Sequence, residues 1–513
     1  MRDPLVFVAR RGRGWRDAER ALQRAFHAAS EAPVTSRRVY LDTFDFRLHR
    51  AGLELFAEEE RLVLRDGTTG EVVAASAWRA GKRSDAVRVF ARDLEAGDLR
   101  DRVAALTEPR ALLEKARARV VQHELAARDA DGQLVSRVRA EALALRRNGR
   151  ECSVRVLHID TPAERTEGEA GAAARVVTAA GYRVAPASAY ELLLIAAGKR
   201  PRHRARLELA PDISMRAAAA AIFERQLNVM EDNEAGIIDD IDPEFLHDYR
   251  VALRRTRTAL RLLKGAFTAD EFRDFRTRFK ALSAPTGALR DLDVHLGARD
   301  EYEKWLPAPL CLHLAPAFAS LLRQRNERQA QLCTVLSNPA YATLKRDWKR
   351  ALGRLRGGDP AGLEADEAAL PVARAEIASR YERMREIAEK PDALDDAALH
   401  RARVQSKRLR YVLEFFAAPL GEPATVAAKR IERLQDALGV YHDAGVLEPV
   451  LQDELRAIPA HASDAVQRAA ALGAWMGQLS TRREKARRRA VRRIGRLTGK
   501  KFENAIQQVT ETQ

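Results

Sequence analysis

Two stretches in the second half of the chain share one pattern of histidine and basic residues. HDYRVALRRTRTAL, residues 247–260, aligns without a gap with HRARVQSKRLRYVL, residues 400–413. Because an α-helix turns about 100° per residue, the histidine and most basic residues of each stretch fall within one sector of a helix. The first stripe comprises His247, Arg250, Arg254, Arg257 and Arg261, and the second comprises His400, Arg403, Lys407 and Arg410.

The chemistry that such stripes favour is the binding of phosphate. A guanidinium presents a planar fork of N–H donors that matches two phosphate oxygens. Like charges three or four residues apart destabilise an isolated helix by about 0.2–0.5 kcal/mol per pair, so two retained stripes indicate an anion that offsets the repulsion. A solvated helix face without a ligand is the alternative. The duplication in register favours the ligand, whereas the histidines alone are weak evidence.

The chain as a whole carries a surplus of basic residues. Its 89 Lys and Arg exceed its 73 Asp and Glu, which gives a formal net charge of +16. Nucleic acid, inorganic polyphosphate and anionic lipid all fit such a surplus. Residues 481–501 add a second basic surface, for which we select Arg482, Arg483, Arg488, Arg489 and Arg492.

Several classes of protein are excluded by composition and motif. The 513 residues are 46% hydrophobic and 32% charged, which is a folded, multidomain composition. No apolar run approaches the roughly 20 residues of a membrane span, and we expect no signal peptide. The chain has three widely spaced cysteines, Cys152, Cys311 and Cys333, which form no CxxC pair, and it has no HExxH motif. We therefore expect neither a metal site nor a cofactor. The cysteine usage fits a protein of the reducing cytoplasm.

From residue 215 onward, apolar residues recur at three- and four-residue spacing, which predicts an all-α domain. The expected helices are Met215–Ala235, Pro243–Gly265, Asp270–Ser283, Ala315–Ser337, Pro339–Gly353, Ala373–Glu389, Asp396–Ala417, Pro423–Leu438, Ala444–Ala457 and Asp464–Gly495. A second repeated segment follows each stripe, Gly287–Val294 and Gly439–Val446, with Asp291 and Asp443 four positions after the glycine. We therefore expect two related bundles, residues 213–355 and 370–510, that pack with pseudo-twofold symmetry.

Residues 1–200 mix short β-like runs with helical patches, which predicts an α+β domain. The expected strands are Leu5–Val8, Arg38–Leu41, Glu60–Leu64, Gln133–Val138 and Cys152–Ile159, and the expected helices are Trp15–Ala29 and Val103–Arg119. Residues 201–212, rich in arginine and proline, are the expected linker to the helical domain at 213–510.

The duplicated H-x-x-R-V-x-x-[RK]-R-x-R block, followed by R-D-L-D-V, resembles the CHAD family, whose name refers to its conserved histidines. The resemblance implies two pseudo-symmetric helical bundles around a basic pore that binds inorganic polyphosphate, often on polyphosphate granules. By that resemblance the binding residues are His247, Arg250, Arg254, Arg255, Arg257, His400, Arg403, Lys407, Arg408 and Arg410.

The segment VYLDTFDFRLHRAGLEL, Val39–Leu55, resembles the Y-x-D-T-x-D-x-x-L-x-x-x-G-x-x-L signature of the CYTH family. That resemblance implies an antiparallel eight-stranded tunnel that binds triphosphate and two metal ions. Its functional residues depart from the family pattern. Leu5–Arg10 carries no acid where the family has E-x-E-x-K, Leu53–Phe56 replaces L-R-x-R, and Cys152–Val156 replaces the late acidic strand. We therefore expect a degenerate tunnel without metal-assisted hydrolysis.

These observations predict a non-enzymatic polyphosphate-binding protein of the cytoplasm, with polyphosphate granules as its expected place. The alternative is a non-specific nucleic-acid-binding protein that uses the same basic surfaces. Nucleic-acid binders often add aromatic residues that stack on bases, whereas aromatic residues are only 6% of this chain and none lies between the basic residues of either stripe. The preferred polyphosphate length and the oligomeric state stay open.

Overall fold

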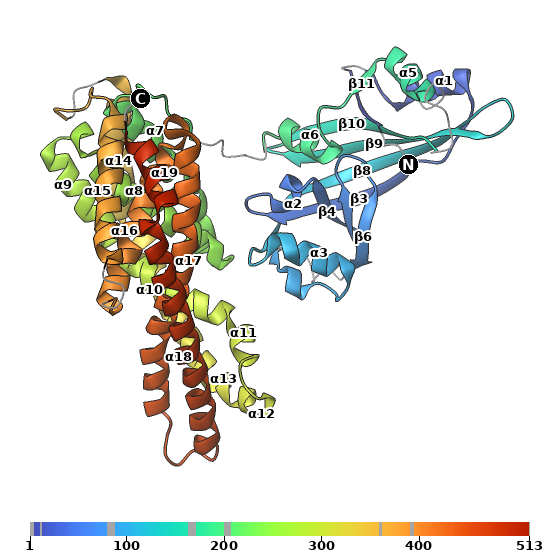
Figure 1. The fold of residues 1–513 in the computed structure, drawn as a ribbon. Coiled ribbons are helices and arrows are strands. Elements are labelled where there is room, and N and C mark those ends of the chain that lie inside the picture. The colour runs from blue at the N-terminus through green and yellow to red at the C-terminus, as the bar shows by residue number, and fades with distance from the viewer. Residues whose placement is uncertain are drawn as a thin grey trace. The chain divides into compact units, whose positions relative to one another are not determined.

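The computed structural model describes residues 5–10, 13–78, 88–162, 171–199, 207–358, 362–389 and 394–511. The chain forms two compact units, Met1–Arg204 and Ala205–Gln513 (Figure 1). Their boundary falls within the stretch expected as a linker, of which residues 201–206 lie outside the described residues. In the part of the chain that is described, no helix is both long and apolar enough to cross a membrane.

The first unit is built on one antiparallel sheet. Its described strands are β1 (Leu5–Ala9), β2 (His27–Ser30), β3 (Val34–Thr43), β4 (Leu53–Glu58), β5 (Arg61–Asp66), β6 (Val72–Ala77), β7 (Arg88–Val89), β8 (Leu112–Arg128), β9 (Leu134–Arg147), β10 (Arg150–Asp160) and β11 (Tyr182–Val184). The strand order is β11-β1-β10-β9-β8-β3-β4-β5-β6, and β2 and β7 also pair with β8. An antiparallel sheet region was expected here, and the structure confirms it.

Short helices cover this sheet. They are α1 (Trp15–Ala25), α2 (Arg47–Arg50), α3 (Asp98–Thr107), α5 (Ala172–Ala179) and α6 (Ala189–Ala196). In Figure 1, α6 lies along β9 and β10, where Leu193 and Leu194 pack with Tyr40 and Leu143 in one hydrophobic core. Helices α1 and α5 close a second core, and α2 and α3 close a third.

Two expected helices of the first unit are wrong in part. The helix expected at Val103–Arg119 ends at Thr107, and strand β8 begins at Leu112. The residues of this strand include good helix formers, but Ala116, Ala118 and Val120 are buried at a spacing of two, which a strand satisfies and a helix does not. The helix expected at Trp15–Ala29 likewise ends at Ala25, because the following residues pair with β8 as β2.

The second unit is helical, as the apolar spacing predicted. Its described α-helices are α7 (Met215–Ile238), α8 (Pro243–Leu262), α9 (Ala269–Ala281), α10 (Ser283–Gly297), α11 (Arg299–Glu303), α12 (Ala308–Cys311), α13 (Ala315–Ser337), α14 (Pro339–Gly357), α15 (Ala369–Ala388), α16 (Asp396–Phe415), α17 (Ala417–Arg456), α18 (Ala465–Gly495) and α19 (Lys500–Thr510). Short 3-10 turns at Lys264–Ala266, Leu312–Leu314 and Arg496–Thr498 join some of them.

The helix boundaries differ from expectation in the second half of this unit. The helices expected at Pro423–Leu438 and Ala444–Ala457 are one element, α17, interrupted at Gly421, whose φ is +71°. Leu438, Tyr441, Ala444 and Leu447 are buried at three-residue spacing, so one helix continues through Gly439 and Gly445. Helices α10, α11, α12 and α19 were not expected.

Candidate anion-binding site

The two basic stretches form helices with matching limits. Helix α8 spans Pro243–Leu262 and α16 spans Asp396–Phe415, so both are 20 residues long and both ends differ by the same 153 positions as the sequence repeat. An aspartate caps each helix. Asp242 accepts hydrogen bonds from the N–H groups of Glu244 and Phe245, and Asp395 accepts one from Ala398. Carboxylates at this position satisfy N–H groups that the helix leaves unpaired.

Helices α8 and α16 pack against each other and bring four cations together. The pKa of Lys407 is lowered to about 6, first by burial and then by the charges of Arg254, Arg403 and Arg250. Burial lowers the pKa of Arg250 to about 10, and the like charges of Arg254 and Arg403 contribute to this lowering. We call these four residues, Arg250, Arg254, Arg403 and Lys407, the central cluster.

Two carboxylates face the central cluster, and they are the repeated aspartates Asp291 of α10 and Asp443 of α17. The Asp291 carboxylate lies 3.8 Å from the Arg250 guanidinium. Asp443 attracts Arg403 and Lys407, and burial raises its pKa. Three arginines that stay charged, together with Lys407 when it is protonated, outnumber these two carboxylates and leave a positive surplus in a half-buried place, where charges are screened less than at an exposed surface.

Some donors of the central cluster have no hydrogen-bond partner within the described chain. The Nε atoms of Arg254 and Arg403 are buried and unpartnered. Arg250 donates to the Gly287 carbonyl at 3.1 Å. An unpaired buried donor carries a penalty of about 1–3 kcal/mol, more for a charged group, so an anion that accepts from these atoms would be stabilising.

The histidines near the central cluster differ in their exposure. His247 is half-buried, and burial together with the charge of Arg290 lowers its pKa to about 4. His400 is exposed, and its ring centroid lies 6.5 Å from that of His442. Burial and the charges of Arg403 and Lys407 lower the pKa of His442 to about 4. Sequence reasoning missed His442, although it directly precedes Asp443 in the repeated segment.

The remaining predicted binding residues lie beside the central cluster on two sides. On one side, Arg255 and Arg410 are neighbours, and both form ion pairs with Glu414. Arg410 also pairs with Glu432 at 3.3 Å. Both predicted binding residues therefore have a carboxylate partner within the protein, while burial and the charges of Arg410 and Arg225 still lower the pKa of Arg255.

On the other side, Arg257 and Arg408 are neighbours, and Arg261 lies close to both. Burial lowers the pKa of each of the three, and like charges lower it further. Arg257 donates to the Ser283 hydroxyl at 2.7 Å. The nearby Glu376 is already paired with Arg380 at 2.7 Å. We call Arg257, Arg261 and Arg408 the lateral cluster.

The basic residues selected on residues 481–501 have different surroundings. Arg483 pairs with Asp396 at 2.7 Å and with Glu448 at 3.3 Å, and Arg488 pairs with Glu484 at 3.1 Å. Arg482 and Arg489 instead line a pocket between α17 and α18. Arg492 is exposed.

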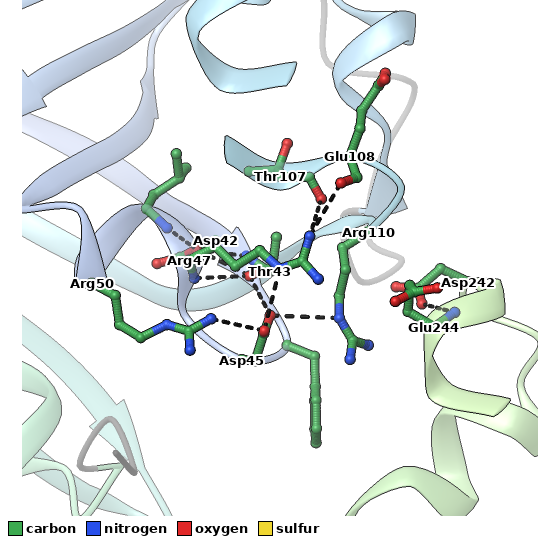
Figure 2. A network of polar contacts seen from close by, with 12 residues as sticks. Asp42, Thr43, Asp45, Arg47, Arg50, Thr107, Glu108, Arg110, Asp242 and Glu244 are labelled. Atoms are coloured by element: carbon green, nitrogen blue, oxygen red, sulfur yellow. Dashed lines mark hydrogen bonds and ion pairs between the residues drawn. The ribbon is translucent and has the colours of Figure 1, made fainter. Parts of the chain in front are cut away.

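In the first unit, the aspartates of the segment Val39–Leu55 accept hydrogen bonds that hold a turn together. Asp42 accepts hydrogen bonds from the backbone N–H groups of Leu48 at 3.0 Å and His49 at 2.9 Å. Asp45 accepts one from Arg50 at 2.8 Å, as Figure 2 shows. The described residues include no group of three or more His, Cys, Asp or Glu side chains that could hold a metal ion.

The sheet also buries a charged network that sequence reasoning missed. Glu141 lies 3.0 Å from the guanidinium of Arg38 and 3.3 Å from that of Arg65, and Arg65 reaches Glu54 at 2.8 Å. Burial alone would raise the pKa of Glu141, but Arg65, His158 and Arg38 hold it well below its usual range. The signal in the sequence was the alternation of inward- and outward-facing positions along the strands, because these charged residues occupy inward-facing positions.

Comparison with known proteins identifies the helical unit. The model of the CHAD domain family matches residues 221–452, so this unit contains a CHAD domain, as the duplicated block predicted. The chain is similar to the crystal structure of the CHAD domain from the plant Ricinus communis, with 24% identity, a TM-score of 0.45, and coverage of 55% of this chain and 94% of that one. It is also similar to PptA from Streptomyces chartreusis, with 16% identity, a TM-score of 0.43, and coverage of 57% and 100%. No curated protein matches the chain.

Proposed function

We propose that the helical unit binds inorganic polyphosphate, without catalysis, along the cations that α8 and α16 bring together. The observation that carries this proposal is the central cluster: four basic side chains lie together, and two of their buried donor atoms have no partner in the described chain. A chain with one negative charge per phosphate can place oxygens against each cation in turn.

We also propose that the two helical repeats are related by a pseudo-twofold axis near Arg254 and Lys407, which are equivalent positions in the repeat. The neighbour relationships of α8 and α16 support this. Arg255 of α8 lies beside Arg410 of α16, and Arg408 of α16 lies beside Arg257 of α8. Because Arg408 is the counterpart of Arg255 and Arg410 that of Arg257, the two contacts exchange under a twofold rotation.

The polyphosphate path is proposed to run from the central cluster toward the lateral cluster. On the opposite side Glu414 already occupies Arg255 and Arg410, so the charge available to a ligand is lower there. On the lateral side, Arg257, Arg261 and Arg408 repel one another in a partly buried place. Polyanion binding therefore relieves more repulsion on this side.

For the first unit we propose a degenerate CYTH-like domain that does not hydrolyse triphosphate. Its buried arginines, Arg38 and Arg65, are engaged by Glu141 and Glu54, and those carboxylates are engaged in return. A tunnel of this family needs cations that hold phosphate and carboxylates that hold metal, and here each set neutralises the other.

We also propose that the whole protein resides in the cytoplasm, at polyphosphate granules.

The test is competition for the full-length protein between long-chain polyphosphate, single-stranded DNA and double-stranded DNA, at equal phosphate concentration and fixed salt. We expect polyphosphate to displace either DNA at a lower concentration than DNA displaces polyphosphate. Equal or stronger displacement by DNA would favour the nucleic-acid alternative. Comparing the order of displacement at two salt concentrations separates a specific preference from the shared electrostatic attraction.

A further inference from the structure

A pocket of about 400 Å³ lies in the helical unit beside the proposed polyphosphate site. Helices α17 and α18 form two of its walls, and the segment around α11 forms the third. Its volume falls in the range of small-molecule sites, about 300–1,000 Å³. Its basic residues serve no role in the polyphosphate path proposed above.

The cations of this pocket form a row on one face of α18. Arg482, Lys485, Arg489 and Arg493 follow one another at spacings of three and four residues and all line the pocket, and Arg433 of α17 faces them. Neighbours at this spacing lie on the same side of a helix and repel one another.

Nearby arginines of the same helix behave differently, because the protein neutralises them. Arg483 and Arg488 are paired with carboxylates, whereas the structure shows no ion pair for the row among the described residues. The carboxylates that line the pocket, Glu301, Asp436 and Asp443, are fewer than its five cations. The pocket therefore has a positive surplus and attracts an anion.

The opposite wall of the pocket is aromatic. Trp305 is half-buried and lines the pocket together with Tyr302, and the two rings meet edge to face with centroids 4.9 Å apart. The guanidinium of Arg482 lies over the indole of Trp305, 3.8 Å from the ring centroid. Aromatic rings and guanidinium planes are the surfaces on which nucleobases stack. An inorganic phosphate chain would leave this wall unused.

We propose that this pocket binds a nucleoside triphosphate, with the base stacked on the Arg482 guanidinium, which Trp305 supports from behind, and the phosphates against Lys485, Arg489 and Arg493. The ligand combines the two chemistries that the pocket combines, a flat aromatic group and several negative charges. This site goes beyond the proposed polyphosphate site, which it adjoins at Asp443, and it does not depend on that proposal.

The test measures binding of ATP, inorganic triphosphate and adenosine to the full-length protein by titration calorimetry at fixed salt without magnesium. Because stacking of one base contributes appreciably to affinity, we expect ATP to bind at least about fivefold more tightly than triphosphate. Trp305→Leu should remove this difference, and Trp305→Phe should keep most of it. The double variant Arg489→Gln with Arg493→Gln, whose positions are at the surface, should weaken ATP at least about tenfold.

Two comparisons make the result decisive. Arg496→Gln changes an exposed arginine just beyond α18 that does not line the pocket, and it should leave ATP affinity unchanged. Arg254→Glu with Lys407→Glu should weaken long-chain polyphosphate and leave ATP unchanged, so the two sites fail separately. Equal affinity for ATP and triphosphate, absence of ATP binding, or loss of ATP binding in the Arg254 and Lys407 variant would each overturn the proposal.

Discussion

Arg261 and Glu414 occupy equivalent positions of α8 and α16, 153 residues apart, and they carry opposite charges. Glu414 binds Arg255 and Arg410, whereas Arg261 lies among Arg257 and Arg408 and adds to their repulsion. This difference between the repeats, together with Glu432 beside Arg410, gives the arginines on one side of the helix pair carboxylate partners and leaves like charges together on the other side.

This asymmetry predicts opposite effects of two matched substitutions. Glu414→Gln should release Arg255 and Arg410, raise polyphosphate affinity and steepen its salt dependence, because more counterions are displaced. Arg261→Gln should lower affinity by several-fold and make the dependence shallower. Binding titrations at three salt concentrations measure both. Identical behaviour of the two variants would contradict the one-sided path.

The central cluster predicts a large loss on charge reversal. Arg254→Glu with Lys407→Glu removes two charged contacts and adds two repulsions, so polyphosphate affinity should fall at least about tenfold. Circular dichroism should show unchanged helicity, because both side chains face a cationic neighbourhood rather than the apolar core. Unchanged affinity in a folded variant would remove the central cluster from the site.

Polyphosphate binding should take up protons near neutral pH. The pKa of Lys407 is lowered to about 6 by burial and by Arg254, Arg403 and Arg250, while Asp443 opposes this effect. A bound polyanion raises that pKa, so in a window that begins near pH 6 the complex holds more protons than the unliganded protein and affinity rises as pH falls. Calorimetry in two buffers of different ionisation enthalpy counts the protons.

Lys407→Arg gives the control for this pH dependence, because arginine stays charged in proteins. The proton uptake should become smaller in this variant, while polyphosphate binding itself persists. The same uptake in both proteins would assign the titration to other groups, of which His247 and His442 are the nearest candidates.

The first unit should release no phosphate from triphosphate, with either magnesium or manganese, above a buffer control. The physical reason is that Arg38 and Arg65 are committed to buried carboxylates and are not exposed to a ligand. Phosphate release by the full-length protein is measured colorimetrically. Turnover that disappears on Glu141→Gln would show that the buried network is catalytic.

Glu141→Ala should strongly destabilise the first unit. The substitution leaves Arg38 and Arg65 with fewer partners inside the sheet, and breaking a buried ion pair in this way typically costs about 3–5 kcal/mol. Thermal unfolding followed by circular dichroism should show an earlier transition of the β signal. Glu124→Ala, an exposed position on β8, is the matched control and should leave this transition in place.

The sequence predicted the elements whose apolar period is strong and missed those whose composition misleads. Helices α8 and α16 begin at Pro243 and Asp396 as expected, because an aspartate cap precedes each. Strand β8 was missed because its alanine, lysine and glutamate residues favour helices and only its pairing with β3 and β9 makes it a strand. Local propensity is overridden in such cases by tertiary pairing.

The candidate site was predictable in part for a similar reason. Helical angle alone places Arg250, Arg254, Arg403 and Lys407 on facing stripes, and the structure brings them together. Helical angle does not reveal which cation pairs with a carboxylate from another part of the chain. The pairing of Arg410 with Glu432 of α17 depends on how α17 packs on α16. The contact of Arg482 of α18 with Trp305 likewise depends on tertiary packing.

The packing of α19 has a consequence for the order in which the chain can fold. Phe502, Ile506 and Val509 are buried, and α19 packs on α15 and α17. During synthesis, a chain that has not yet reached residue 500 therefore leaves an apolar strip of the helical unit uncovered, whereas the sheet of the first unit already has all its strands. A nascent protein of this kind can complete its first unit early, whereas its second unit exposes apolar surface that favours aggregation until α19 emerges.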